Sequence, residues 1–65
     1  EDIEETVMAA INKLPSKCRE IFVLNRVEGK KYREISEILG ISVNTVENQM
    51  GIALRKLRKE LEHLI

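Results

Sequence analysis

Four residues close together in the chain, Val43, Asn44, Glu47 and Asn48, carry side chains that can read the edges of DNA bases. An asparagine amide can bond to an adenine edge at two points, a glutamate can accept from N4 of cytosine, and an apolar group can meet a thymine methyl. At about 100° per residue in a helix, Asn44 and Asn48 fall opposite the apolar stripe of the same segment, and Glu47 lies at the edge of that side. We predict that these four residues contact bases in the major groove of double-stranded DNA.

Basic and hydroxyl side chains on both sides of this segment are suited to binding DNA phosphates. Phosphate contacts position a protein on the duplex without reading its sequence. An ordinary solvated surface charge is the alternative for each lysine taken alone, and packing in the core is the alternative for the tyrosine. The predicted phosphate-binding residues are Lys30, Lys31, Tyr32, Arg33, Ser42, Thr45, Arg55 and Lys59.

Gly51 falls on the same outward side as the two asparagines. A glycine inside a helix costs about 1 kcal/mol relative to alanine. Either it lets a phosphate backbone come close, or it is simply tolerated, and the sequence leaves both interpretations open.

The scaffold that would present these side chains is a helix-turn-helix between Tyr32 and Val46. A short helix ends at Gly40, which permits a sharp reversal, and Ile41 holds the turn against the core. Ser42 is a good N-cap for the second helix, whose N-terminal end would enter the major groove. An antiparallel helical hairpin without DNA binding is the alternative. The inward-facing residues are Tyr32, Ile35, Ile38 and Leu39 in the short helix, and Val46, Met50, Ala53, Leu57, Leu61 and Leu64 in the second.

Two further helices are predicted before this motif. The first covers residues 3–13, with Asp2 as its N-cap and Glu5 reaching back from the third position. A corner follows at 14–16, because Pro15 is accepted only in the first turn of a helix, where Ser16 can accept from unpaired N–H groups. The second helix is predicted to stop at Gly29. Their inward-facing residues are Ile3, Val7, Ala10, Ile11 and Leu14, then Cys18, Ile21, Phe22, Leu24 and Val27.

Length and composition fit one small all-α domain. The chain has 65 residues, of which 43% are hydrophobic and 34% charged, too rich in aliphatic residues for a disordered segment. We predict a four-helix domain over residues 1–65 with a long C-terminal recognition helix. The formal net charge is zero, but residues 1–14 carry four acids and one lysine, whereas residues 15–65 carry ten basic and seven acidic side chains. The acidic first helix should therefore lie away from DNA phosphates.

Several classes of protein are excluded by what the sequence lacks. No apolar run approaches the roughly 20 residues that span a bilayer, and the acidic start resembles no signal peptide, so we expect a cytoplasmic protein without a membrane partner. One cysteine, Cys18, and one histidine, His63, cannot build a structural zinc site. The sequence contains no nucleophile paired with a base and no phosphate loop, so we expect no enzyme activity, cofactor or small-molecule substrate.

Four stretches of the chain are together characteristic of a known family. They are Leu14-Pro-Ser-Lys-Cys-Arg-Glu-Ile-Phe22, Glu28-Gly-Lys-Lys-Tyr-Arg-Glu-Ile-Ser36, Leu39-Gly-Ile-Ser-Val-Asn-Thr-Val46 and Ala53-Leu-Arg-Lys-Leu-Arg58. Over nearly its whole length the chain resembles the C-terminal promoter-binding domain, region 4, of the extracytoplasmic-function (ECF) sigma factors of bacterial RNA polymerase.

The resemblance implies a function and three partners. A four-helix domain of this kind recognises the promoter −35 element through the helix that begins near Val43, while a hydrophobic surface docks on the flap of the polymerase beta subunit. Anti-sigma factors of the family occupy the same surfaces, and a region 2 normally precedes the domain, which agrees with a chain that begins at Glu1 without an initiator Met. Glu47 stands where many members carry Lys or Arg, so the resemblance does not imply a particular −35 sequence.

Two other interpretations remain open at this stage. The output domains of two-component and quorum-type regulators share a Ser-Val-x-Thr-Val-Glu-Asn string, but Leu14, Pro15 and Tyr32 favour the sigma factor. The second alternative is a protein-interaction module without DNA binding, in which the leucine-rich C-terminus packs on another chain. Its surface would consist of Leu54, Leu57, Leu61, Leu64 and Ile65. The salt dependence of DNA affinity would separate these classes.

Overall fold

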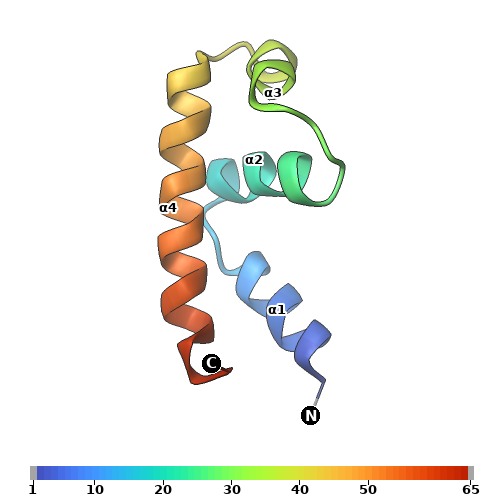
Figure 1. Ribbon diagram of the computed structural model, residues 1–65, viewed down its shortest axis with the longest axis vertical. Helices are drawn as coiled ribbons and strands as arrows, with labels where there is room; N and C mark the ends of the chain where they lie inside the picture. The colour runs from blue at the N-terminus through green and yellow to red at the C-terminus, as the bar shows by residue number, and fades with distance from the viewer. Residues whose placement is uncertain (1, 65) are drawn as a thin grey trace.

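The computed structural model describes residues 2–64, and every regular element in that range is helical (Figure 1). This confirms the predicted all-α class. The elements are α1 (Ile3–Asn12), α2 (Ser16–Arg26), α3 (Tyr32–Leu39), α4 (Val43–Leu61) and a single 3-10 turn, η1 (Glu62–Leu64). No helix within residues 2–64 combines the length and the apolar character needed to cross a membrane.

The long helix α4 forms one side of the molecule, and the other three helices are arranged along it (Figure 1). α3 contacts its N-terminal end, α2 its middle and α1 its C-terminal half, over a molecule 38 Å long and 19 Å wide. The acidic first helix therefore lies at the opposite end of the molecule from the start of α4 (Figure 1).

The core is built from all four helices. Ile21 of α2, Ile35 of α3, and Val46 and Ala53 of α4 are fully buried, and Ile11 of α1 belongs to the same buried cluster. Burying an isoleucine or valine side chain contributes about 1.5–3 kcal/mol. The predicted stripe of α4 is confirmed at Val46, Met50, Ala53 and Leu57, and Leu61 packs partly buried against the core. The side chain of Leu64 and all of Ile65 lie outside the described residues.

Two of the predicted helix starts are confirmed. The Asp2 carboxylate accepts from the backbone N–H groups of Glu4 and Glu5 at 3.0 and 3.4 Å, which caps α1. The reciprocal bond predicted for Glu5 is not among the hydrogen bonds of residues 2–64; instead, the Thr6 hydroxyl donates to the Asp2 carbonyl at 3.0 Å. Ser42 caps α4 as predicted.

Helix α2 differs from its prediction at both ends. Pro15 is the N-cap residue and Ser16 is the first helical residue. No side chain caps this helix, because the hydroxyl expected to accept belongs to Ser16, which is already part of the first turn. α2 stops at Arg26 rather than at Gly29, since the carbonyl of Val23 accepts from the N–H groups of both Val27 and Glu28 and the regular ladder ends there. Gly29 adopts a left-handed φ of 74°, but in the loop beyond the helix.

Three residues predicted to face inward are exposed. Ile3, Val27 and Ile38 are 64%, 65% and 55% exposed, respectively. Ile3 is the first residue of α1, Val27 follows the end of α2, and Ile38 lies on the side of α3 that neither α2 nor α4 covers. Each belongs to an apolar face, but no second helix extends far enough to bury it.

Candidate nucleic-acid interface

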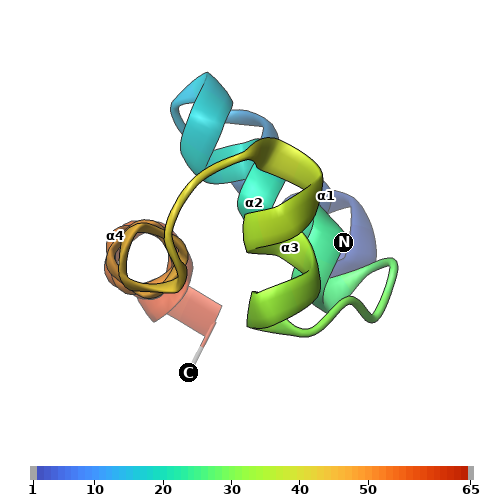
Figure 2. The ribbon, with the colours of Figure 1, turned by 90° about the horizontal axis from the view of Figure 1, so that it is seen from above.

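The turn between α3 and α4 has the predicted helix-turn-helix geometry. Gly40 adopts a left-handed φ of 67°, which a residue with a side chain rarely adopts, and the N–H of Ile41 bonds to the Ser36 carbonyl at 3.0 Å. Ile41 is half-buried and packs against the core, as predicted. In the view down α4, α3 lies beside the start of that helix and runs across its direction (Figure 2).

The four predicted base-reading residues share the exposed side of the first two turns of α4. Asn44, Glu47 and Asn48 are exposed, and Val43 is 39% exposed. Val46 points the opposite way, into the core. The structure thus brings the four side chains together, at the end of the molecule where α4 begins (Figure 1).

The two hydroxyls predicted to bind phosphate already have a structural role. Ser42 Oγ accepts from the backbone N–H of Thr45 at 3.0 Å, and the two side-chain oxygens lie 2.9 Å apart. Ser42 is exposed and Thr45 half-buried. Both stand at the N-terminus of α4, where free N–H groups and the helix dipole favour an anion.

The predicted phosphate-binding cations precede and follow the base-reading segment in the chain and do not form one cluster. Lys31 and Arg33 are exposed around the start of α3, while Lys30 is half-buried. Tyr32 packs partly buried against the core, which was the alternative interpretation of this residue. Arg55 is exposed in the middle of α4, and a Cβ built on Gly51 would lie 3.6 Å from one of its guanidinium nitrogens.

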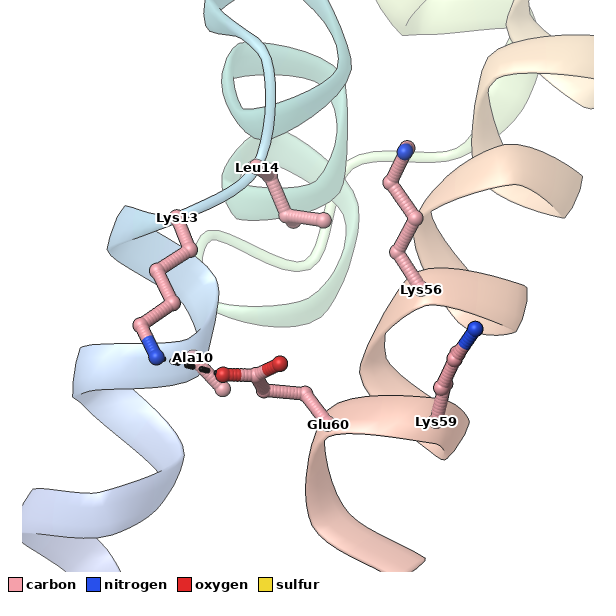
Figure 3. A pocket seen from close by; sticks show the side chains of 6 residues that line it. All are labelled: Ala10, Lys13, Leu14, Lys56, Lys59 and Glu60. Atoms are coloured by element: carbon pink, nitrogen blue, oxygen red, sulfur yellow. Dashed lines mark hydrogen bonds and ion pairs between the residues drawn. The ribbon is translucent and has the colours of Figure 1, made fainter.

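Lys59 is separated from the base-reading turns. It lies fifteen residues beyond Asn44, about 22 Å along the axis of α4. There it lines a pocket of about 260 Å³ between α1 and α4, together with Ala10, Lys13, Leu14, Lys56 and Glu60 (Figure 3).

An ion pair across this pocket joins α1 to α4. Lys13 Nζ donates to Glu60 Oε1, and this hydrogen bond, with the charge of Lys13, holds the pKa of Glu60 below its ordinary value (Figure 3). The sequence alone does not predict this pair. No sequence signal would have found it, because the two residues lie 47 positions apart and only the packing of α1 on α4 brings them together.

Cys18 is a buried structural residue, as the lack of an activating partner in the sequence indicated. It is 1% exposed, and its Sγ donates to the backbone carbonyl of Gln49 in α4 at 3.4 Å. Burial raises the pKa of the thiol, and the positive charge of Lys56 opposes this only in part. A thiol in this state is a poor nucleophile.

Comparison with known proteins identifies the family. The family described as "Sigma-70, region 4" matches residues 4–57. This range contains α1 without Ile3, all of α2 and α3, the turn that follows α3, and most of α4. The chain belongs to the sigma-70 region 4 family. This assignment decides against the two-component and quorum-type alternative.

One relative connects this region 4 chain with the ECF branch of the family. The chain is 36% identical over 63 residues to the ECF RNA polymerase sigma factor SigW of Bacillus subtilis strain 168. The match covers 97% of this chain and 34% of the relative, so the chain spans about a third of that protein's length. The family match and this relative together confirm the resemblance to an ECF region 4. No solved structure matches the chain significantly.

Proposed function

We propose that this region 4 domain, residues 1–65, binds the −35 element of promoters as part of an ECF sigma factor that directs RNA polymerase to initiate transcription. The observation that carries the proposal is the exposed group of Val43, Asn44, Glu47 and Asn48 at the start of a capped helix. Such a helix start fits the major groove, and these side chains have complementary partners on base edges.

The distribution of charge supports the same orientation on DNA. The exposed cations Lys31 and Arg33 precede the base-reading turns, and Arg55 follows them. Phosphates on either side of the groove would meet these cations, and the N-terminus of α4 adds a further anion site. The acidic α1 lies at the far end of the molecule from the start of α4, so in the proposed orientation its charges would not oppose the duplex (Figure 1).

Apolar surface away from the base-reading turns supports a contact with polymerase. Ile3 and Met8 on α1 and Val27 after α2 are exposed, and we propose that these apolar side chains contribute to contacts with the beta flap or with an anti-sigma factor. We propose a cytoplasmic, non-catalytic protein that acts through these two surfaces.

The protein-interaction module without DNA binding is the weaker proposal. The leucines on which it depended are mostly used within the domain: Leu57 is buried and Leu61 half-buried in the core, whereas Leu54 is exposed.

The test is the salt dependence of DNA affinity, measured with the full-length protein and core polymerase on promoter fragments recovered from genomic DNA by the same complex. Replacing Lys31 and Arg33 by glutamine should weaken binding and reduce the slope of log affinity against log salt by about 0.9 for each phosphate that the variant no longer neutralises. The matched control is Lys17→Gln, which removes an exposed cation that is paired with Glu20 on α2. If the double variant and wild type show the same slope of log affinity against log salt, the proposed orientation is wrong.

A further inference from the structure

Glu47 has no structural role within the described part of the chain. Its side chain is exposed on the second turn of α4, and it takes part in none of the ion pairs or side-chain hydrogen bonds of residues 2–64. Helix neighbours three and four positions away are the usual partners of a surface carboxylate. Those positions hold no cation: they are Val43, Asn44, Met50 and Gly51.

Glu47 is also the single charged residue in the first twelve positions of α4. From Val43 to Leu54 the helix carries no lysine or arginine, and the next charge is Arg55. A carboxylate on a helix that faces phosphates is repelled by them. A negative charge at this position therefore needs a compensating hydrogen-bond donor on the DNA.

The major groove offers few such donors. An ionised carboxylate only accepts hydrogen bonds. Cytosine presents its N4 amino group, whereas guanine presents only the acceptors O6 and N7. Adenine presents a donor beside an acceptor, a pair that matches the amides of Asn44 and Asn48 better than a carboxylate. The first three turns of α4 lack the arginine or lysine that would bind guanine.

We propose that Glu47 is a specificity-determining residue that selects cytosine, and rejects guanine, at one position of the strand read by α4. This inference rests on the proposed function, since it requires that the start of α4 enters the major groove. Lys or Arg at this position would have the opposite preference, for guanine over cytosine.

The experiment is a selection from duplexes with ten randomised base pairs, made by the full-length protein bound to core polymerase and read by sequencing. Wild type should enrich cytosine and deplete guanine at one position. Glu47→Gln, which gains an amide donor, should shift that position toward adenine, and Glu47→Arg should shift it toward guanine. Each change in base ratio should be about tenfold or more, and the other positions should keep their preferences.

The matched control is Glu37→Gln, because Glu37 is an exposed carboxylate on α3 outside the base-reading group. It makes the same change in charge and should raise affinity for all sequences without changing any base preference. Circular dichroism of each variant confirms that the helices are retained.

Two kinds of failure are distinguishable. If wild type enriches a sequence but both Glu47 variants retain its preference at every position, Glu47 does not read a base, and the inference is overturned while the proposed function stands. If wild type enriches no sequence, the proposed function fails, and the inference fails with it.

Discussion

Ser42 Oγ accepts a hydrogen bond from the backbone N–H of Thr45 at 3.0 Å, and this bond sets where the candidate DNA-reading helix begins. Ser42 follows the left-handed Gly40 by two residues, so the chain reversal and the helix cap lie in the same short turn. The side chains of Val43 and Asn44 follow directly. Their position relative to α3 therefore depends on a local hydrogen bond as well as on the core.

Removing this cap should destabilise the domain. Ser42→Ala leaves the Thr45 N–H without its side-chain partner, and we expect the free energy of unfolding to fall by about 1 kcal/mol. Urea denaturation followed by circular dichroism measures it. Ser42→Asp is the control, because aspartate caps as well as serine does and should retain the stability. Equal stability of the alanine variant and wild type would show that the cap contributes nothing.

Replacing Gly51 by alanine should stabilise the domain by about 1 kcal/mol. Gly51 has no positive φ, and an added Cβ would make only an ordinary contact with Arg55 at 3.6 Å, so the gain in helix propensity is not opposed. The same substitution at Gly40 is the control with the opposite sign, because its φ of 67° is strained for alanine. Thermal unfolding measures both. A Gly51→Ala variant that unfolds more easily than wild type contradicts this prediction.

The Gly51 variant also separates the two interpretations of this glycine. If the phosphate backbone approaches α4 closely at this point, the variant should lose DNA affinity while it gains stability. If glycine is merely tolerated, affinity should stay at the wild-type value.

Features that depend on a few neighbouring residues could be predicted from the sequence. Asp2 and Ser42 act on N–H groups two or three positions away, and Gly40 acts on its own backbone. The outward side of α4 follows from the helical period alone, which is why Asn44 and Asn48 are exposed as predicted. Their contacts with bases remain predictions.

Features that depend on how far one helix reaches past another could not be predicted. A spacing of three and four shows that Ile38 shares a face with Ile35, but not that the covering helices stop short of it. A glycine with left-handed geometry marks a loop but does not fix the last helical residue, so α2 ends at Arg26 and Gly29 follows three residues later. The pocket between α1 and α4 depends wholly on tertiary packing.

The Cys18 thiol should be protected from alkylation in the folded domain. Burial raises its pKa, so at pH 8 the folded thiol carries less thiolate than the unfolded one. Iodoacetamide should therefore modify it slowly in buffer and rapidly in urea, as followed by mass spectrometry. Equal rates under the two conditions would contradict the buried position.

The same shift in pKa has a consequence for stability at high pH. Because the folded state holds the thiol proton more tightly, stability should fall as the pH rises above 9.0, the ordinary pKa of the thiol. Cys18→Ala should lack this dependence, and urea unfolding at pH 8 and pH 10 compares the two proteins.

The Lys13–Glu60 ion pair should contribute to stability at neutral pH and not in acid. The pKa of Glu60 is lowered in the folded state, so its contribution is present above the unfolded pKa and is lost as pH falls through the folded value. Both side chains are exposed, so the effect is small. Glu60→Gln should unfold at a lower urea concentration than wild type at pH 7, and the difference should shrink as the pH is lowered into the acid range.

Glu62→Gln is the matched control for this pair. Glu62 is exposed and takes part in neither ion pair of the described residues. A Glu62 variant that loses as much stability at pH 7 as the Glu60 variant would attribute the effect to net charge rather than to the contact with Lys13.

Promoter-directed transcription in vitro by the full-length protein with core polymerase tests whether the start of α4 reads the −35 element. Wild type is compared with an Asn44→Ala, Asn48→Ala double variant, whose substitutions lie on the exposed side of α4 and leave the core intact. We predict that the variant binds core polymerase normally but loses initiation that depends on the −35 element. If wild type neither binds core nor directs transcription, the chain does not act as part of a sigma factor. If the double variant initiates as efficiently as wild type, Asn44 and Asn48 do not read the −35 element.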